Sequence, residues 1–315
     1  MPLPVSPADV EAAARRIAGL VRRTPVIDVE VAVEDTEIPL VLKLELLQHT
    51  GSFKPRGAFN RVLSAEVPPV GLIAASGGNH GLAVAHVASR LGLRAEIFVP
   101  ETAPDIKVER LRSFGSDIVV HLAGELYADA HEASVIRAEE TGALVVHPYD
   151  QPEVVAGQGT VARELEEQVP GLDTVLVAVG GGGLIGGAAA WFDNRVDVVA
   201  VEPETSSALS QALDAGHPVD VHVSGVAADS LGARRVGDIA FAVARRAVAR
   251  HLTVADQDIV EAQHRLWRDV RLVAEPGGAT ALAAITSGAY RPTPGERVAV
   301  VVCGANTDPA TVAGG

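Results

Sequence analysis

The feature that most constrains this fold is a repeated alternation of short Val- and Ile-rich runs with longer Ala-rich stretches. Examples are "GLIAASGG" followed by "NHGLAVAHVASRLG", "RAEIFVP" followed by "PDIKVERLRSFG", and "DTVLVAVGGGG" followed by "LIGGAAAWFD". Continuous apolar strands separated by helical segments are typical of parallel sheets that are covered by helices on both faces. The sequence therefore predicts an α/β fold with its functional loops at the carboxyl ends of the strands.

Length and composition narrow the class of protein. The 315 residues suggest two domains, and "HPYDQPEVVAGQGT", with two prolines and two glycines, is the best candidate for a boundary. The net charge of −14 argues against a nucleic-acid partner, because phosphate binding needs a basic face. The single cysteine excludes a disulfide within the chain and fits a reducing compartment.

Two segments bear on membranes and targeting. Residues 174–192 carry no charge over 19 residues, a length that could span a bilayer. Six of them are glycine, so a strand, a glycine loop and the start of a helix explain the segment better. The N-terminal stretch "MPLPVSPADVEAAARRIAGL" lacks the basic start and apolar run of a signal peptide. We expect a cytoplasmic protein without a membrane partner.

The stretch "HTGSFKPRGAFN" contains Lys54, one of only three lysines among 26 Lys and Arg residues. An amine can lose its proton and attack a carbonyl, whereas a guanidinium stays charged. Thr50 to Ser52 suit a turn and Pro55 suits a first helical turn, so Lys54 would lie near a helix N-terminus, where the dipole favours the free amine. On composition alone, a solvated lysine on a turn is the alternative.

Two glycine motifs follow apolar runs. In "SGGNHG", residues 76–81, two glycines let the backbone approach a ligand and Asn79 can donate a hydrogen bond; the alternative is a tight turn with a structural His80. In "VGGGGLIGG", residues 179–187, four consecutive glycines form a nest of donors suited to a phosphate. The same loop satisfies G-x-G-x-x-G, with Glu202 ending the next strand, so a dinucleotide pyrophosphate stays possible.

A fourth segment, "VVVCGANTD", places Cys303 at the carboxyl end of a buried strand, where ligand contacts occur in α/β sheets. A small buried hydrophobe is the alternative for this cysteine. Glu275 precedes a Pro-Gly helix entry and is a candidate for a helix cap or a ligand contact; of the two, we favour the structural role. The ten histidines show no metal-ligand spacing, and no G-x-S-x-G or H-E-x-x-H motif occurs, so no metal site is predicted.

Together these motifs resemble the pyridoxal-phosphate enzymes of fold type II, the tryptophan synthase β-like fold. Within that fold they are most similar to the serine/threonine dehydratases (threonine ammonia-lyases) and the related serine racemases. The resemblance also includes "HPYDQPEVVAGQGT" and "SLGARR". It implies pyridoxal 5'-phosphate as cofactor and two domains, each with a mostly parallel, helix-covered sheet. Residues 1–62 and 150–315 would form a large domain, residues 63–149 a small domain, and the active site would lie in the cleft between them.

The resemblance also implies roles for individual residues. Lys54 would bind the cofactor aldehyde covalently and remove the α-proton of the substrate. Phe53 would pack beside the cofactor ring, Asn79 would bind its 3-hydroxyl, and Cys303 would lie beside the pyridine nitrogen. The phosphate would be held by the backbone of Gly180, Gly181, Gly182, Gly183 and Leu184. The substrate carboxylate would be held by Ser76, Gly77, Asn79 and His80.

Three departures from the family pattern refine this expectation. Gly77 stands where the racemase relatives carry a serine that acts as an acid–base group, so racemisation is disfavoured. Glu202 matches one cation ligand of those relatives, but Ala208 replaces the second, which puts that metal site in doubt. Tyr149 stands where relatives often have a smaller polar residue, and it could narrow the site or alter selectivity.

The resemblance implies a dehydratase that converts L-threonine or L-serine to 2-oxobutanoate or pyruvate plus ammonia, by α-proton abstraction and β-elimination. A small amino acid would be the substrate, and a homodimer would fit the family. The alternatives are a pyridoxal-phosphate-dependent serine racemase or β-replacement enzyme, and an amino-acid-binding regulatory protein on a degenerate scaffold. A more distant alternative is an NAD-dependent oxidoreductase that uses the glycine loop, but it gives Lys54 and Asn79 no shared task.

Overall fold

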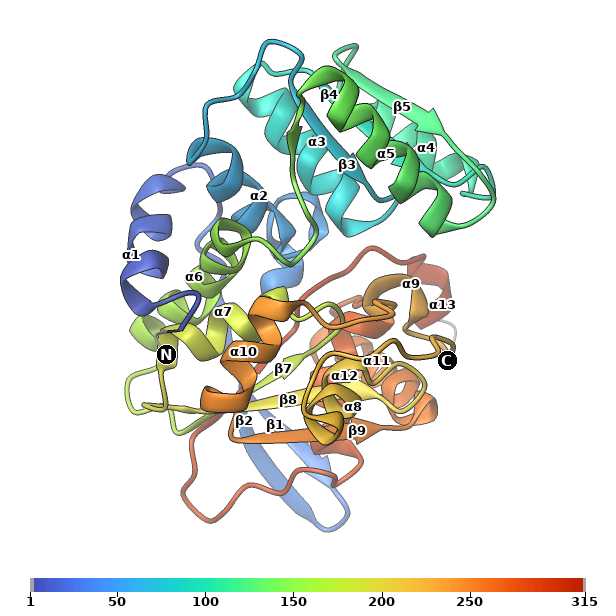
Figure 1. Cartoon of the computed structure of the whole chain (residues 1–315). Coiled ribbons are helices and arrows are strands. Elements are labelled where there is room, and N and C mark those ends of the chain that lie inside the picture. The colour runs from blue at the N-terminus through green and yellow to red at the C-terminus, as the bar shows by residue number, and fades with distance from the viewer. Residues whose placement is uncertain (1–2, 314–315) are drawn as a thin grey trace.

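The computed structural model describes residues 3–313, which build two separate sheets, one above the other in Figure 1. The larger sheet has six strands. In spatial order they are β1 (Val26–Val33), β2 (Thr36–Lys43), β10 (Val298–Val301), β7 (Thr174–Ala178), β8 (Asp197–Pro203) and β9 (Arg250–Val254). The β1–β2 hairpin is antiparallel, with Val26 opposite Lys43, and the remaining neighbours pair parallel.

The smaller sheet has four parallel strands, inserted in the chain between β2 and β7. In spatial order they are β5 (Ile118–Leu122), β4 (Ala95–Val99), β3 (Leu72–Ala75) and β6 (Leu144–Val145). The predicted α/β fold with mostly parallel, helix-covered sheets is confirmed. The predicted domain boundaries at residues 62 and 150 stay a prediction. Residues 1–2 and 314–315, the two ends of the predicted large domain, lie outside the described residues.

Helices cover both faces of the smaller sheet because its strands are apolar on both sides. Successive side chains of a strand point to opposite faces. Leu72 and Ala74 of β3 accordingly pack in one core with α3 (Asn79–Leu91) and α4 (Asp105–Arg112), and Ile73 packs with α5 (Tyr127–Thr141) on the other face. In Figure 1, α5 lies in front of β3 and β4.

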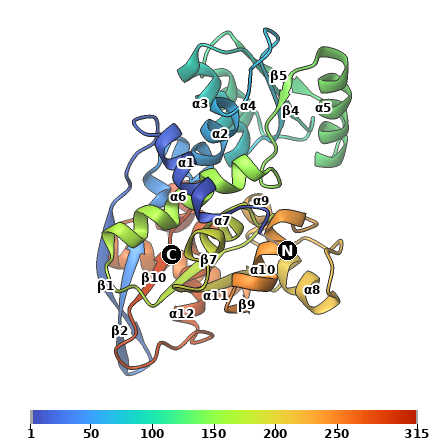
Figure 2. The same cartoon turned by 60° about the vertical axis from the view of Figure 1, so that its left-hand side comes forward.

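The larger sheet is covered in the same way. One face packs on α12 (Pro276–Thr286), which in turn contacts α11 (Asp256–Val270). The other face packs on α7 (Gly183–Phe192), which contacts α6 (Pro152–Gln168) and α10 (Asp238–Ala247); Figure 2 shows α6 running alongside α7. The remaining helices are α1 (Pro7–Arg16), α2 (Lys54–Leu63), α8 (Ala208–Ala215), α9 (Ala228–Leu231), α13 (Pro309–Ala313) and the short 3-10 helices η1 (Glu45–Leu47) and η2 (His49–Gly51).

The uncharged stretch at residues 174–192 is strand β7, a glycine loop and helix α7, as predicted. Within residues 3–313, none of the helices combines the length and the apolar character needed to cross a bilayer.

Candidate active site

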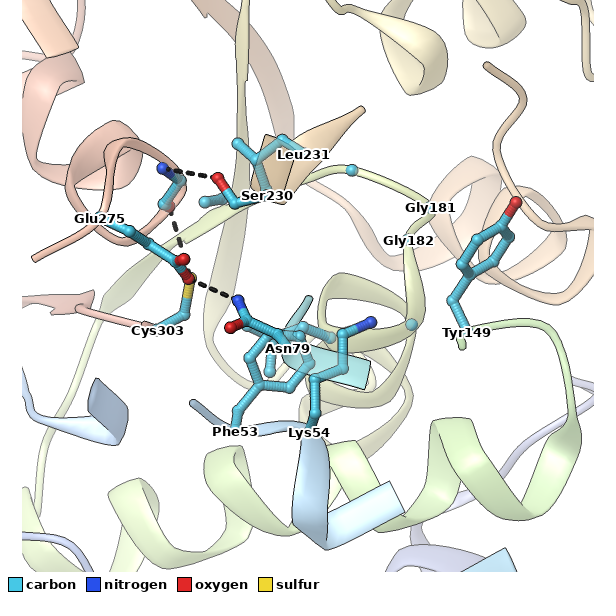
Figure 3. Close-up of a pocket in the computed structure, with 15 residues that line it drawn as sticks. Phe53, Lys54, Asn79, Tyr149, Gly181, Gly182, Ser230, Leu231, Glu275 and Cys303 are labelled. Atoms are coloured by element: carbon cyan, nitrogen blue, oxygen red, sulfur yellow. Dashed lines mark hydrogen bonds between the residues drawn. The ribbon is translucent and has the colours of Figure 1, made fainter. Parts of the chain in front are cut away.

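A pocket lies between the two sheets, and its walls come from both (Figure 3). The N-terminal ends of α2 and α3 contribute side chains, the loop after β7 contributes backbone, and the segments that precede α12 and follow β10 close the far side. The structure therefore brings together the following residues proposed from the sequence: Phe53, Lys54, Asn79, Gly180, Gly181, Gly182, Gly183, Leu184 and Cys303.

Lys54 is the first residue of α2, and its Nζ donates a hydrogen bond to the carbonyl oxygen of Pro148 at 2.8 Å. The amine also lies 5.2 Å from the centre of the Phe53 ring. Burial lowers the pKa of Lys54 to about 8, and the charge of the Glu275 carboxylate opposes this shift. The free amine is therefore well populated at mildly alkaline pH, as a nucleophile or base requires.

The turn before Lys54 is joined to the segment around Cys303 by backbone hydrogen bonds. The N–H of Phe53 donates to the carbonyl of Cys303 at 3.2 Å, and the N–H of Ala305 donates to that of Gly51 at 2.8 Å. Gly51 has a φ of 77°, a left-handed conformation that glycine adopts without strain. These contacts hold the lysine and the cysteine on neighbouring walls of the pocket.

The glycine loop follows β7 and leads into α7. Residues 3–313 supply no hydrogen-bond acceptor for the backbone N–H groups of residues 181–184, which lie at the start of this helix. Gly182 has a φ of 93°, and a Cβ on it would lie 2.4 Å from the Cβ of Ala240. Unpaired N–H groups at a helix N-terminus form a site for an anion, so the loop fits a phosphate group.

Tyr149 packs against this loop, and a Cβ on Gly181 would lie 2.2 Å from its ring. Its hydroxyl donates to the carbonyl of Arg235 at 3.4 Å, and burial raises its pKa to about 12, so the phenol stays neutral. In Figure 3 the ring lies across the loop from Asn79 and Glu275. Tyr149 is therefore a wall of the anion cradle.

Cys303 is buried two residues after the end of β10. Its Sγ donates to the carbonyl of Gly277 at 3.4 Å. Burial raises the pKa of the thiol to about 12, and the nearby Glu275 acts in the same direction. The thiol of Cys303 therefore gives this wall of the pocket a neutral group that forms only weak hydrogen bonds.

Asn79 is the first residue of α3, and both ends of its amide are bound. Its Nδ2 donates to Oε1 of Glu275 at 2.6 Å, and its Oδ1 accepts from Nδ2 of Asn306 at 2.5 Å. Of the two roles considered for Glu275, the favoured helix cap is not formed: its carboxylate makes no side-chain cap for α12 and lines the pocket instead.

Sequence reasoning missed two residues that belong to this site. Ser230 lines the pocket and its Oγ accepts from the N–H of Gly277 at 3.1 Å. Asn306 does not line the pocket itself, but it donates a hydrogen bond to Asn79, which does. Their motifs, "SLGARR" and "CGANTD", were the available signals, but spacing gives no sign of which member of a motif faces inward.

The residues proposed for the substrate carboxylate lie around the start of α3. Ser76 Oγ accepts from the N–H of Gly78 at 3.2 Å, and Nε2 of His80 binds the carbonyl of Val146 at 2.7 Å. Burial lowers the pKa of His80 to about 3, so the ring is neutral. Ser76, Gly77 and His80 do not line the pocket, and their contact with substrate stays a prediction.

Glu202 lies apart from this pocket. Its carboxylate accepts hydrogen bonds from the N–H of Leu209 at 2.7 Å and from the N–H and hydroxyl of Ser210 at 2.8 and 2.7 Å, at the start of α8. In the described part of the chain, no three His, Cys, Asp or Glu side chains are grouped so that they could hold a metal ion.

Fold and pocket together define a class of α/β enzyme in which a buried lysine faces a cradle of backbone donors. A ligand with an aldehyde, a phosphate and an aromatic ring would match the three parts of this pocket. The aldehyde matches the amine of Lys54, the phosphate matches the glycine loop, and the ring matches the neutral face around Phe53 and Cys303. Residues 17–304 match the family model described as pyridoxal-phosphate dependent enzyme. The chain belongs to this family, which confirms the predicted cofactor.

Four similar proteins illustrate the family. The chain is 35% identical over 305 residues to an L-threonine ammonia-lyase from Thermotoga maritima (95% of this chain, 75% of the relative). It is 36% identical over 304 residues to a phenylserine dehydratase from Ralstonia pickettii (95% and 92%). In structure it is similar to maize serine racemase, with a TM-score of 0.90 and 32% identity over 99% of this chain and 96% of the other. The chain spans about half, 53%, of the biosynthetic L-threonine dehydratase from Escherichia coli.

Proposed function

We propose that the protein is a pyridoxal-phosphate-dependent dehydratase that converts a β-hydroxy amino acid, L-threonine or L-serine, to a 2-oxo acid and ammonia. The observation that carries this proposal is the position of the Lys54 amine, whose pKa is lowered to about 8, in one pocket with the unpaired N–H groups of the glycine loop. Three of the four similar proteins described above carry names of the ammonia-lyase or dehydratase type.

Bound pyridoxal phosphate would supply an aldehyde that condenses with amines and a ring that stabilises negative charge on the α-carbon. The glycine loop would hold its phosphate and Asn79 its ring hydroxyl. Lys54 would accept the α-proton of the substrate at Nζ, because burial favours its free amine. The β-hydroxyl would leave as water with one proton, and the α-proton that Lys54 accepts balances this proton over the whole reaction. The enamine product would become an imine, from which a second water molecule would release ammonia to give the 2-oxo acid.

Two residues favour elimination over racemisation in this proposal. Gly77 carries no side chain that could return a proton to the α-carbon. The neutral thiol of Cys303 brings no charge that would keep a pyridine nitrogen protonated, so negative charge at the α-carbon would be short-lived and a β-leaving group would depart promptly. Serine racemase remains the second candidate because of the structural similarity to the maize enzyme.

A panel of β-hydroxy amino acids with coupled detection of 2-oxo acid and ammonia tests the reaction. L-threonine, L-serine, 3-hydroxyaspartate and phenylserine differ in the group that the pocket must accept. We expect equal amounts of both products from at least L-threonine or L-serine. Accumulation of D-serine without pyruvate would instead assign racemisation.

Lys54→Ala and Lys54→Arg test the choice of lysine. The arginine variant keeps the positive charge but cannot lose its proton at physiological pH. Both variants should lose turnover and the visible absorption of the bound cofactor. Retention of both properties in either variant would show that another residue performs this task.

We further propose that the enzyme is a homodimer in the cytoplasm. The expected assembly follows from the family resemblance, and the single cysteine, which is buried, fits a reducing compartment. Light scattering on the purified holoenzyme should give twice the chain mass of 32.6 kDa. A mass of one chain at working concentration would contradict the dimer.

A further inference from the structure

Glu275 is a buried carboxylate, 5% exposed, that the proposed reaction does not use. Its Oε1 lies 2.6 Å from Nδ2 of Asn79, although 196 residues separate the two in the chain. Gly304 leaves room for this oxygen because it has no side chain: a Cβ on Gly304 would lie 1.9 Å from Oε1 of Glu275. Burying a carboxylate costs free energy unless other groups donate hydrogen bonds to it. The position of Glu275 in the pocket therefore suggests that it has a function there.

The partner of Glu275, the amide of Asn79, is bound from the other side as well. Asn306 donates from Nδ2 both to Oδ1 of Asn79 at 2.5 Å and to the carbonyl of Thr50 at 2.8 Å. With its oxygen bound by Asn306 and one N–H bound by Glu275, the amide has a fixed orientation and one N–H left for a ligand. The resulting chain of hydrogen bonds joins the residue before α12, the start of α3 and the turn that precedes Lys54. Figure 3 shows its first link, between Glu275 and Asn79.

The charges around Glu275 come from several elements. Burial raises its pKa to about 7, the hydrogen bond from Asn79 opposes this, and Asp229 of α9 raises it further. Lys54 of α2 and Lys107 of α4 lower it. The neighbouring Cys303 is a neutral thiol. The carboxylate is therefore within reach of ionisation at neutral pH, when it is the stronger acceptor for Asn79.

We propose that Glu275 is a positioning residue that acts through Asn79, whose amide it holds with the free N–H directed at the cofactor ring. The inference rests on the role of Asn79 proposed above, and it is independent of which amino acid is the substrate. Glu275 does not touch the reacting atoms in this account. Its effect is on how tightly and in which orientation the cofactor is bound.

A double-mutant cycle on cofactor binding tests the proposal. The full-length apoprotein is titrated with pyridoxal phosphate, and the dissociation constant and the circular dichroism of the visible band are recorded without substrate for wild type, Glu275→Ala, Asn79→Ala and the double variant. Glu275→Ala should weaken binding about tenfold, because a hydrogen bond to a charged group is lost. In the Asn79→Ala background the same substitution should change binding by no more than about twofold, since its effect passes through the amide.

Two further variants separate positioning from folding. Glu275→Gln keeps an oxygen that can accept from Asn79, so binding within about threefold of wild type and a wild-type dichroism band are expected. Glu202→Gln is the matched control: Glu202 is also buried with a pKa raised to about 7, but it binds Leu209 and Ser210 outside the pocket. This control should leave cofactor binding unchanged.

Equal losses from Glu275→Ala in the wild-type and Asn79→Ala backgrounds would overturn the proposal, because Glu275 would then act independently of the amide. Unchanged binding in Glu275→Ala, or in Asn79→Ala, would also overturn it. Failure of the dehydratase assignment would appear only in the product assays, so the two outcomes are distinguishable.

Discussion

At the scale of single residues, Lys54 differs from an ordinary lysine because it is buried at the start of α2. Burial lowers its pKa to about 8, whereas a solvated lysine titrates near 10.4. The unprotonated amine is the form that attacks an aldehyde. The rate of pyridoxal phosphate capture by the apoprotein should therefore rise with pH and level off above a midpoint of about 8. Stopped-flow absorbance across a pH series measures this, and a midpoint near 10 would contradict the buried environment.

Gly181 is one of the residues where the loop has no room for a side chain. A Cβ there would overlap the ring of Tyr149 at 2.2 Å, so Gly181→Ala should displace the loop or the ring at a cost of about 1–3 kcal/mol. We expect at least about tenfold weaker cofactor binding, since the cradle of N–H donors is distorted. Adding Tyr149→Ala removes the clash and should recover part of the loss. If the double variant is as impaired as Gly181→Ala, the steric account is wrong.

At the scale of elements, a buried group of charges fixes the start of α2 to the larger sheet. Arg56, 1% exposed and two residues after Lys54, donates to both carboxylate oxygens of Glu45 at 2.8 and 2.7 Å and to Glu164 of α6 at 3.1 Å. Lys43, at the end of β2, donates to the other oxygen of Glu164 at 2.5 Å. This buried ion group joins β2, η1, α2 and α6 directly behind the lysine of the pocket.

Removing one member should destabilise the whole chain, because a buried charge without its partner is costly. Arg56→Ala should lower the free energy of unfolding by about 3–5 kcal/mol, measured by urea denaturation of the holoenzyme. The exposed pair of Arg291 and Glu34 supplies the matched control, and Arg291→Ala should cost less than about 1 kcal/mol. Equal effects of the two substitutions would show that the buried group contributes no more than a surface pair.

The sequence predicts the elements better than it predicts these contacts. The apolar run before "SGGNHG" and the glycines of "VGGGGLIGG" marked β3, β7 and the loops that follow them, because local composition determines strands and turns. The contact of Arg56 with Glu164 joins residues 108 apart, and that of Asn79 with Glu275 joins residues 196 apart. Such partners are determined by the packing of the two sheets, so the contact of Glu275 with Asn79 was recognisable only once the fold was known.

At the scale of the whole molecule, one ion pair joins the two sheets beside the pocket. Nζ of Lys107, on α4 of the smaller sheet, lies 2.7 and 2.8 Å from the carboxylate oxygens of Asp229 on α9. Asp229 directly precedes Ser230, which lines the pocket. Separation of the sheets would break this pair, so the pair favours the closed arrangement in which side chains from both sheets surround a ligand.

The side chains of Lys107 and Asp229 are 33% and 71% exposed, so solvent weakens their attraction and the expected effect is modest. Lys107→Ala or Asp229→Ala should raise KM for the amino acid about twofold to fivefold at low salt, with a smaller change in kcat, because closure contributes to binding. High salt should raise the wild-type KM toward that of the variants, and the exchanged pair Lys107→Asp with Asp229→Lys should restore much of the affinity. A KM that is independent of salt in wild type would show that the two sheets stay together through packing alone.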